Sequence, residues 1–242
     1  MLKINKRICV LTYQTLHRKT MDTLFRLKAS GYVNVCVYAK PFYYTKKYTP
    51  LVTHRPIIEE FYNFDSPQYF DIINNLQYEI RHIDAYEEIR EEADTIFLVC
   101  GAGLIPEKVV DKYCIINAHP GYIPMVRGLD ALKWAIVENS PIGVTTHLLG
   151  KYVDAGDIIE RRKVPIYHND TFHTVAYRQY EMEIQMLVRA IEKKEQISFF
   201  TDGEDYPVHK RMPNEVEQKL YEKFEIYKVQ TCQEENQWNS EI

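Results

Sequence analysis

The sequence predicts an α/β fold: a Rossmann-like, mostly parallel twisted sheet with helices on both faces, a late antiparallel strand pair and a C-terminal extension. The chain opens on two short apolar runs, 7–13 and 33–38, separated by an amphipathic helical pattern. Such a β-α-β unit implies parallel strands joined by a right-handed crossover. Later, strand-like segments at 143–150 and 157–166 are separated only by a short turn, which predicts antiparallel pairing.

The other elements follow from local signals along the chain. The first helix ends at Ser30-Gly31, and the run TIFLVCG at 95–101 is the clearest buried strand. Pro106 suits the first turn of a short helix, and the run CIINA that follows is the next strand. The remaining predicted elements are helices at 69–76, 86–93, 129–138, 171–193 and 213–224, and a short strand within 78–83.

Length and composition favour a single main domain. The chain has 242 residues, 45% of them hydrophobic and 26% charged, which suffices for one full core. We expect a main domain over residues 1–200 and an extension, not an independent domain, over 201–242. The net charge of −4 gives no footprint for nucleic acid. No apolar run approaches the ~18 residues of a membrane span, so no membrane partner is expected.

Cysteine usage bears on the compartment. Five scattered cysteines without a CxxC pair fit neither a disulfide framework nor a zinc ribbon, and favour reduced thiols in the cytoplasm. No spacing of metal ligands is present, so we expect no metal.

The stretch CIINAHPG carries the first candidate chemistry. Strand side chains alternate, so Asn117 and His119 point to the same side, and Pro120-Gly121 stops the strand there. In open α/β sheets, ligands bind beyond the carboxyl ends of the strands. The pair is equally compatible with a catalytic site and with two side chains that tie down a turn.

Three blocks in order distinguish these readings. They read NAHPGYIPMVRG, GVTTH and VDAGDII, over a region that extends from about Thr95 to Ile166. Together they resemble the 10-formyltetrahydrofolate-dependent formyltransferases. The resemblance implies that Asn117, His119 and Asp154 are catalytic. An acceptor amine would attack the formyl carbon, Asn117 and His119 would stabilise the oxyanion, and Asp154 would support proton transfer through His119.

The resemblance also implies that 10-formyltetrahydrofolate is the formyl donor, and it indicates which loops bind it. Main-chain groups of the CGAGLIP turn and of the loop before Asp154 would hold the pterin, with His147 as a supporting partner or a core histidine. CGAGLIP half-resembles a dinucleotide fingerprint, but Pro106 replaces the third glycine. The implied folate-binding residues are Gly101, Ala102, Gly103, Leu104, Ile105, His147, Tyr152 and Val153.

Three branches of that family differ in the acceptor. Glycinamide ribonucleotide formyltransferases carry a glycine-rich phosphate loop after the first strand, whereas LTYQTLHRKT contains no glycine. Methionyl-tRNA formyltransferases carry a further tRNA-binding domain, whereas residues 203–242 are acidic. The chain most resembles the third branch, which formylates nucleotide-linked amino sugars, such as a dTDP-4-amino-4,6-dideoxyhexose, for bacterial surface polysaccharides (lipopolysaccharide O-antigen).

Contacts to such a sugar nucleotide need cations and flat surfaces. The candidates are Arg127, Trp134, Arg55 and Arg81, with aromatic stacking groups within 42–48. For each one, an ordinary solvated charge or packed ring is the alternative. The family habit also suggests a homodimer. Formylation of another amine, and an inactive folate- or nucleotide-binding module, remain the alternative functions.

Overall fold

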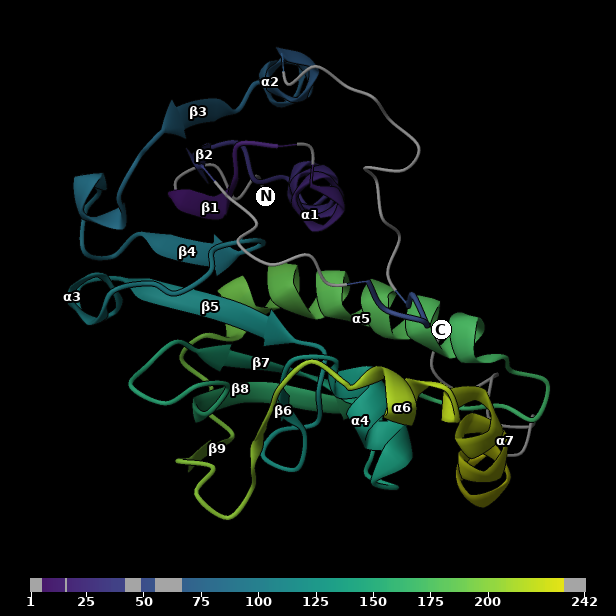
Figure 1. Cartoon of the computed structure of the whole chain (residues 1–242). Helices are drawn as coiled ribbons and strands as arrows, with labels where there is room; N and C mark the ends of the chain where they lie inside the picture. Colours follow the sequence, from purple (N-terminus) through teal and green to yellow (C-terminus); the bar gives the residue numbers. More distant parts are fainter. Residues whose placement is uncertain (1–5, 16, 42–48, 55–66, 233–242) are drawn as a thin grey trace.

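The chain folds around one mixed eight-stranded sheet (Figure 1). The computed structural model describes residues 6–15, 17–41, 49–54 and 67–232. The strand order is β3-β2-β1-β4-β5-β7-β8-β9, and β6 and β10 form a separate two-stranded parallel pair. The strands are β1 (Ile8–Tyr13), β2 (Val35–Lys40), β3 (Glu79–His82), β4 (Ile96–Val99), β5 (Cys114–His119), β6 (Arg127–Gly128), β7 (Gly143–Leu148), β8 (Gly156–Lys163), β9 (Phe199–Thr201) and β10 (Val208–His209).

Helices cover both faces of the sheet, so the predicted fold class is confirmed. On one face α1 and α5 pack against alternate residues of the central strands, such as Val10 and Leu98. On the other face α3 and η2 cover the intervening residues, such as Leu11 and Phe97. The helices are α1 (Arg18–Ala29), α2 (Pro67–Asn75), η2 (Tyr86–Glu88), α3 (Glu107–Val110), α4 (Ala131–Val137), α5 (Phe172–Lys193), α6 (Asn214–Glu217) and α7 (Leu220–Thr231).

The predicted antiparallel pair is present as β7 and β8, and two further antiparallel contacts flank it. β7 also runs antiparallel to β5, and β9 joins β8 at the sheet edge. The β5 contact brings residue 147 opposite residue 117, which matters for the site below.

Several predicted boundaries differ from the structure. The helix expected at 86–93 shortens to the 3₁₀ turn η2, whose amides at Asp84 and Ala85 are bonded by Glu88. The helix expected at 213–224 is two helices, α6 and α7, with a break at 218–219. β6, β9 and β10 were not predicted, because two or three residues are too few to display a period.

The segment after α5 packs back onto the main sheet. β9 crosses residue 200, the boundary expected from the sequence. Leu220, Phe224 and Tyr227 of α7 share one apolar cluster with Ile136 of α4 and Phe172 of α5. Within the described ranges, no helix combines the length and apolar character that crossing a bilayer requires.

Candidate active site

The carboxyl end of β5 presents Asn117 and His119 on one face, while Ala118 between them packs into the opposite core cluster. The His119 side chain is only 6% exposed. A Cβ atom at Gly121 would lie 2.5 Å from His119 Nε2, so only glycine leaves the imidazole its place. The Pro-Gly turn therefore makes room for the ring that precedes it.

β7 supplies the partners that fix this strand end. Its register places His147 opposite Asn117 and Thr145 opposite His119. The Thr145 hydroxyl donates to the Gly121 carbonyl at 2.8 Å and accepts from the amide of residue 123 at 3.1 Å. The turn after His119 is thus tied to the neighbouring strand.

His147 is fully buried and orients the Asn117 amide. His147 Nδ1 lies 3.2 Å from the Leu148 carbonyl oxygen, which can only accept, so Nδ1 carries the ring proton. Burial lowers the pKa of His147 to about 4, so the ring is neutral near pH 7. Its Nε2 lone pair therefore accepts from Asn117 Nδ2 at 3.2 Å, which leaves the second amide hydrogen of Asn117 for another acceptor.

Asp154 arrives on the turn between β7 and β8 with a left-handed backbone (φ 45°), which aspartate tolerates better than most residues. Its Oδ2 lies 3.6 Å from His119 Nδ1 and accepts from the Gly128 amide at 3.0 Å. Its Oδ1 lies 4.0 Å from His147 Nε2. Burial acts to raise the pKa of Asp154, but His119, His147 and the Gly128 amide outweigh it and hold the pKa below its ordinary value.

The three residues singled out from the sequence therefore converge. The His119 ring faces the Asp154 carboxylate through Nδ1, while its buried Nε2 has no hydrogen-bond partner among the described residues. An imidazole held this way can take a proton at Nε2, or donate one there when protonated, with the carboxylate stabilising the cation. Asn117 adds an oriented amide donor on the same face.

The two loops expected to hold a folate lie beside this cluster. Ile105 of the first loop and Leu149, which directly precedes the second, pack against the same apolar cluster on the site's face of the sheet. Leu104 is 92% exposed and Val153 is 54% exposed, so both loops offer apolar side chains to a ligand. Folate binding by these loops stays a prediction. Of the other expected folate contacts, Gly101 and Ala102 are buried, Gly103 is exposed and Tyr152 is half-buried.

Arg127 does not take the place expected of a sugar-nucleotide contact. It is 5% exposed, and its guanidinium donates to main-chain carbonyls. Nε and Nη2 bond the Val153 carbonyl at 3.1 and 2.7 Å, and Nη1 bonds the Gly203 carbonyl. The expectation is corrected because an arginine saturated by carbonyls is not available to a phosphate.

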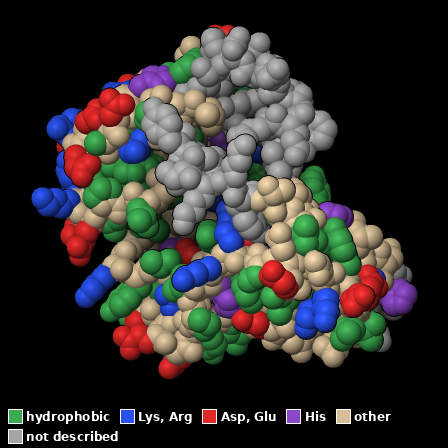
Figure 2. Space-filling view, viewed as in Figure 1, with side chains coloured by type: hydrophobic (Ala, Val, Ile, Leu, Met, Phe, Trp, Pro, Cys, Tyr) green, Lys and Arg blue, Asp and Glu red, His purple; other side chains and the backbone are tan. Residues whose placement is uncertain are grey.

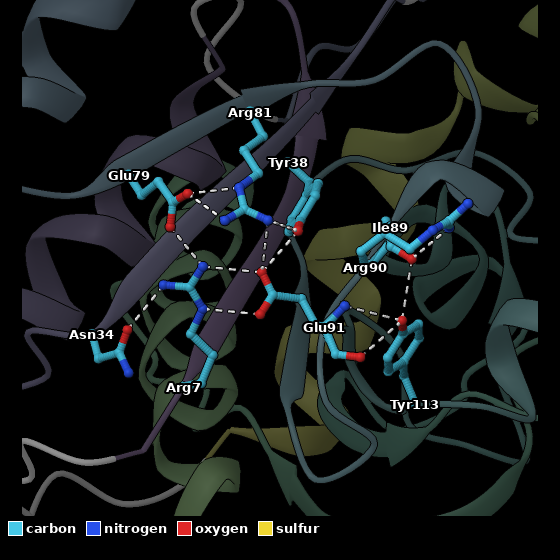
Figure 3. Close-up of polar contacts among 9 residues, drawn as sticks. All are labelled: Arg7, Asn34, Tyr38, Glu79, Arg81, Ile89, Arg90, Glu91 and Tyr113. Carbon is cyan, nitrogen blue, oxygen red and sulfur yellow. Dashed lines mark hydrogen bonds and ion pairs between the residues drawn. The ribbon is translucent and has the colours of Figure 1, made fainter.

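Arg81 belongs to a network of polar contacts with Glu79, Glu91 and Tyr38 (Figure 3). Strand register places it in one row with Asn117 but four strand spacings away, or ~19 Å. Its guanidinium pairs with Glu79 at 2.6 Å and with Glu91 at 3.4 Å, and donates to the Tyr38 hydroxyl. Arg81 is therefore a member of an edge network of ion pairs and not of the candidate site.

Trp134 is occupied by the C-terminal segment. Its indole Nε1 donates to the Lys210 carbonyl at 2.9 Å, and its ring packs on His209 with centroids 4.8 Å apart. Trp134 is half-buried, and its expected role as a wall of the sugar pocket stays a prediction. Arg55 and the aromatic stretch 42–48 lie outside the described residues.

Three groups that contribute to the site were not predicted from the sequence. Thr145 was detectable, because the alternation in GVTTH places it on the same face as His147. The Gly128 amide and the carbonyls of residues 202–206 were not, because backbone groups have no residue signature. In the described ranges, no three His, Cys, Asp or Glu side chains are grouped to hold a metal ion; the absence of a metal stays a prediction.

The sequence comparisons agree with the geometry. The family model described as "Formyl transferase" matches residues 63–191, more than half of the chain. A methionyl-tRNA formyltransferase from Fusobacterium nucleatum is 30% identical over 54% of this chain and 44% of its own length. A second, from Prochlorococcus marinus, is 27% identical over 64% of this chain and 42% of its own length. The chain thus spans less than half the length of these curated relatives.

Solved structures share the fold at low identity. A 4-N formyltransferase from Francisella tularensis has a TM-score of 0.55 at 18% identity, covering 89% of this chain and 86% of that chain. An N-formyltransferase from Helicobacter canadensis, solved with folinic acid and dTDP-3-aminofucose, has a TM-score of 0.57 at 16% identity, covering 89% and 80%. A phosphoribosylglycinamide formyltransferase from Anaplasma phagocytophilum has a TM-score of 0.56 at 21% identity, covering 82% and 91%.

Proposed function

Because the chain belongs to the formyl transferase family, we propose that it transfers the formyl group of 10-formyltetrahydrofolate to the amine of a nucleotide-linked amino sugar. The observation that carries the proposal is the arrangement of three side chains at the end of β5. The Asp154 carboxylate faces His119 Nδ1, the buried His119 Nε2 has no hydrogen-bond partner among the described residues, and Asn117 lies on the same face of the strand as His119. Residues 1–200 would hold this chemistry, and residues 201–242 would extend the same body.

The proposed chemistry assigns each side chain one task. The acceptor amine attacks the formyl carbon and gives a tetrahedral intermediate whose oxygen carries negative charge. The free amide hydrogen of Asn117 donates to that oxygen, and protonated His119 adds a second donor at Nε2. His119 becomes protonated by taking the proton of the attacking nitrogen at Nε2, and the ionised Asp154 stabilises this imidazolium. The proton then passes to N10 of the folate as the bond between the formyl carbon and N10 breaks, and tetrahydrofolate leaves.

Four observations favour an amino sugar over the other acceptors. The segment after β1 contains no glycine with which to wrap a phosphate. Residues 203–242 hold five Lys or Arg against nine Asp or Glu, which disfavours a tRNA backbone. On the face shown in Figure 2, basic and acidic side chains are interspersed and do not gather into a basic patch. A similarly folded neighbour was solved with dTDP-3-aminofucose.

Methionyl-tRNA is the second candidate acceptor, because the curated sequence relatives are methionyl-tRNA formyltransferases. A panel decides between the acceptors: the protein is incubated with 10-formyltetrahydrofolate and, in parallel, with dTDP-amino sugars, glycinamide ribonucleotide and methionyl-tRNA. We expect formylated dTDP-amino sugar as the main product. Formylation of tRNA alone would reassign the acceptor, and folate binding without turnover of any acceptor would favour a binding module.

A further inference from the structure

Residues 199–209, which we call the C-terminal strap, pair with two strands next to the Asp154 turn: β9 lies along β8 (Figure 1), and β10 pairs with β6. On one side β9 pairs with β8 directly after the turn, with Thr201 opposite Gly156. On the other side β10 pairs with β6, the dipeptide that carries Arg127. The strap lies beyond residue 191, where the match to the family model ends.

Arg127 joins the strap to the turn. Its Nε and Nη2 bond the carbonyl of Val153, the residue before Asp154, and its Nη1 bonds the Gly203 carbonyl of the strap. The next residue, Gly128, donates its amide to the Asp154 carboxylate at 3.0 Å. Two consecutive residues thus hold the backbone and the side chain of the same catalytic turn.

Gly203 allows this contact because it has no side chain. Its φ of +71° belongs to the left-handed region, and a Cβ atom there would overlap the Arg127 guanidinium. The guanidinium therefore fills the space that the missing side chain leaves. His209 closes the arrangement from the strap side, with Nδ1 bonded to the Arg127 carbonyl at 3.1 Å and Nε2 to Glu138 at 2.8 Å.

We propose that Arg127 and Gly203 are positioning residues for formyl transfer: the guanidinium bridges the Val153 and Gly203 carbonyls and thereby holds the Asp154 carboxylate against His119. The inference rests on the proposed function and adds to it. The strap completes a catalytic turn whose chemical residues all lie within the family match. An arginine that served the acceptor's phosphates would act on substrate affinity, whereas this one acts on the rate of the chemical step.

Gly203→Ala tests the bridge without touching a group that reacts. Gly31→Ala is the matched control, because Gly31 also has a left-handed φ (+82°) but no atom within 4 Å of an added Cβ. We expect Gly203→Ala to lower kcat about tenfold to a hundredfold, with the KM for the acceptor changed less than about twofold. Gly31→Ala should keep the wild-type kcat. Equal kcat values for the two variants would overturn the proposal.

A comparison of Arg127→Lys with Arg127→Gln separates a positioning role of Arg127 from an effect of its positive charge. Lysine keeps the positive charge but cannot bond two carbonyls with a planar fork. A positioning role predicts that Arg127→Lys loses kcat as severely as Arg127→Gln does. A phosphate-binding role predicts instead that Lys retains most of the activity and that Gln raises the KM for the acceptor, and this result would refute the bridge.

Hydrogen exchange tests the coupling without turnover. Amides of residues 150–156 should exchange about tenfold faster or more in Gly203→Ala than in Gly31→Ala, because local opening of the turn becomes easier. Unchanged exchange would refute the inference even if the wild type were active. A wild type that formylates none of the acceptors would refute the proposed function, while the exchange experiment would still decide whether the strap holds the turn.

Discussion

At the scale of single residues, the site depends on two histidines in different protonation environments. His119 has one ring nitrogen on a carboxylate and the other unpartnered among the described residues, whereas both ring nitrogens of His147 are engaged. Burial keeps His147 neutral, so its lone pair can orient the Asn117 amide. His119 is therefore the proton carrier of the proposed reaction, and His147 holds a neighbour in place.

Replacement of the proton carrier tests this division. We expect His119→Asn to lower kcat by roughly a hundredfold or more, because one oxyanion donor and the proton acceptor are lost together. The affinity for folate should remain nearly that of the wild type, since loops 101–105 and 150–154 are untouched. Steady-state kinetics and a binding titration give both values; a mild effect on kcat would remove His119 from the chemistry.

The neutral His147 predicts a dependence of stability on pH. Its pKa falls from 6.5 to about 4 on folding, so the unfolded chain binds a proton that the folded protein does not. The stabilisation is present above pH 6.5 and is lost as the pH falls from about 6.5 toward about 4, by up to about 1.4 kcal/mol per pH unit. Asp154 adds little in this window, because its lowered pKa places its titration below 3.8.

Urea unfolding at pH 7.5, 6.0 and 5.0 measures the dependence. We expect the free energy of unfolding of the wild type to fall over this series, and His147→Gln to show a smaller fall because the titrating ring is gone. If both proteins lost stability equally with falling pH, other histidines would account for the dependence.

Single residues also differ in how far their place in the candidate site could be predicted from the sequence. Asn117 and His119 were predictable because strand alternation and a Pro-Gly stop fix their side and their place. The environment of Arg127 was not, since its carbonyl partner Gly203 is 76 residues away in the chain. Whether an arginine meets a phosphate or a carbonyl is decided by tertiary contacts that no local pattern carries.

At the scale of elements, short strands and short helices position many of the residues of the candidate site. The long, periodic segments β1, β5 and α5 were predicted within a few residues, because their apolar patterns continue over one or more full periods. β9 and β10 owe their existence to pairing with β8 and β6. Tertiary contact rather than local propensity determines such elements.

A buried ion pair joins α4 to α6. Replacing its two members tests how much this contact contributes to holding the C-terminal segment against the rest of the protein. Lys133 bonds Glu217, with side-chain exposures of 1% and 0%, and Glu217 also accepts the Leu51 amide at 2.6 Å. We expect Lys133→Met and Glu217→Gln each to destabilise the protein by about 3–5 kcal/mol, because each leaves an uncompensated buried group. The double variant should lose less than the sum of the two, by about 1–3 kcal/mol.

Urea unfolding of the four proteins completes this cycle. Thermal unfolding followed by circular dichroism gives an independent measurement, and it should rank the four proteins in the same order of stability. Strictly additive losses in the two single variants would show that Lys133 and Glu217 do not stabilise each other, and would leave the docking of α6 to other contacts, such as the bond from the Leu51 amide to Glu217.

At the scale of the whole molecule, the sheet gathers the chemistry at one place. The parallel half ends in β5, and the antiparallel half begins with β7, so the catalytic pair of β5 meets His147 at the seam. The β7–β8 turn brings Asp154 to His119, and β9 of the C-terminal strap pairs with β8 directly after that turn. The fold class could be predicted from the β-α-β opening, whereas the strap could not, because it is held by tertiary contacts such as Arg127 with the Gly203 carbonyl and His209 with Glu138.

In the proposed reaction, the chain moves a formyl group by means of Asn117, His119 and Asp154. The most direct measurement follows a carbon-13 label from the formyl carbon of 10-formyltetrahydrofolate into a dTDP-amino sugar, by wild type and by Asp154→Asn. The account predicts labelled formamide with the wild type and a rate lower by about a hundredfold or more with Asp154→Asn, which lacks the charge that stabilises the His119 imidazolium. Equal rates for the two proteins, or no label transfer by the wild type, would contradict it.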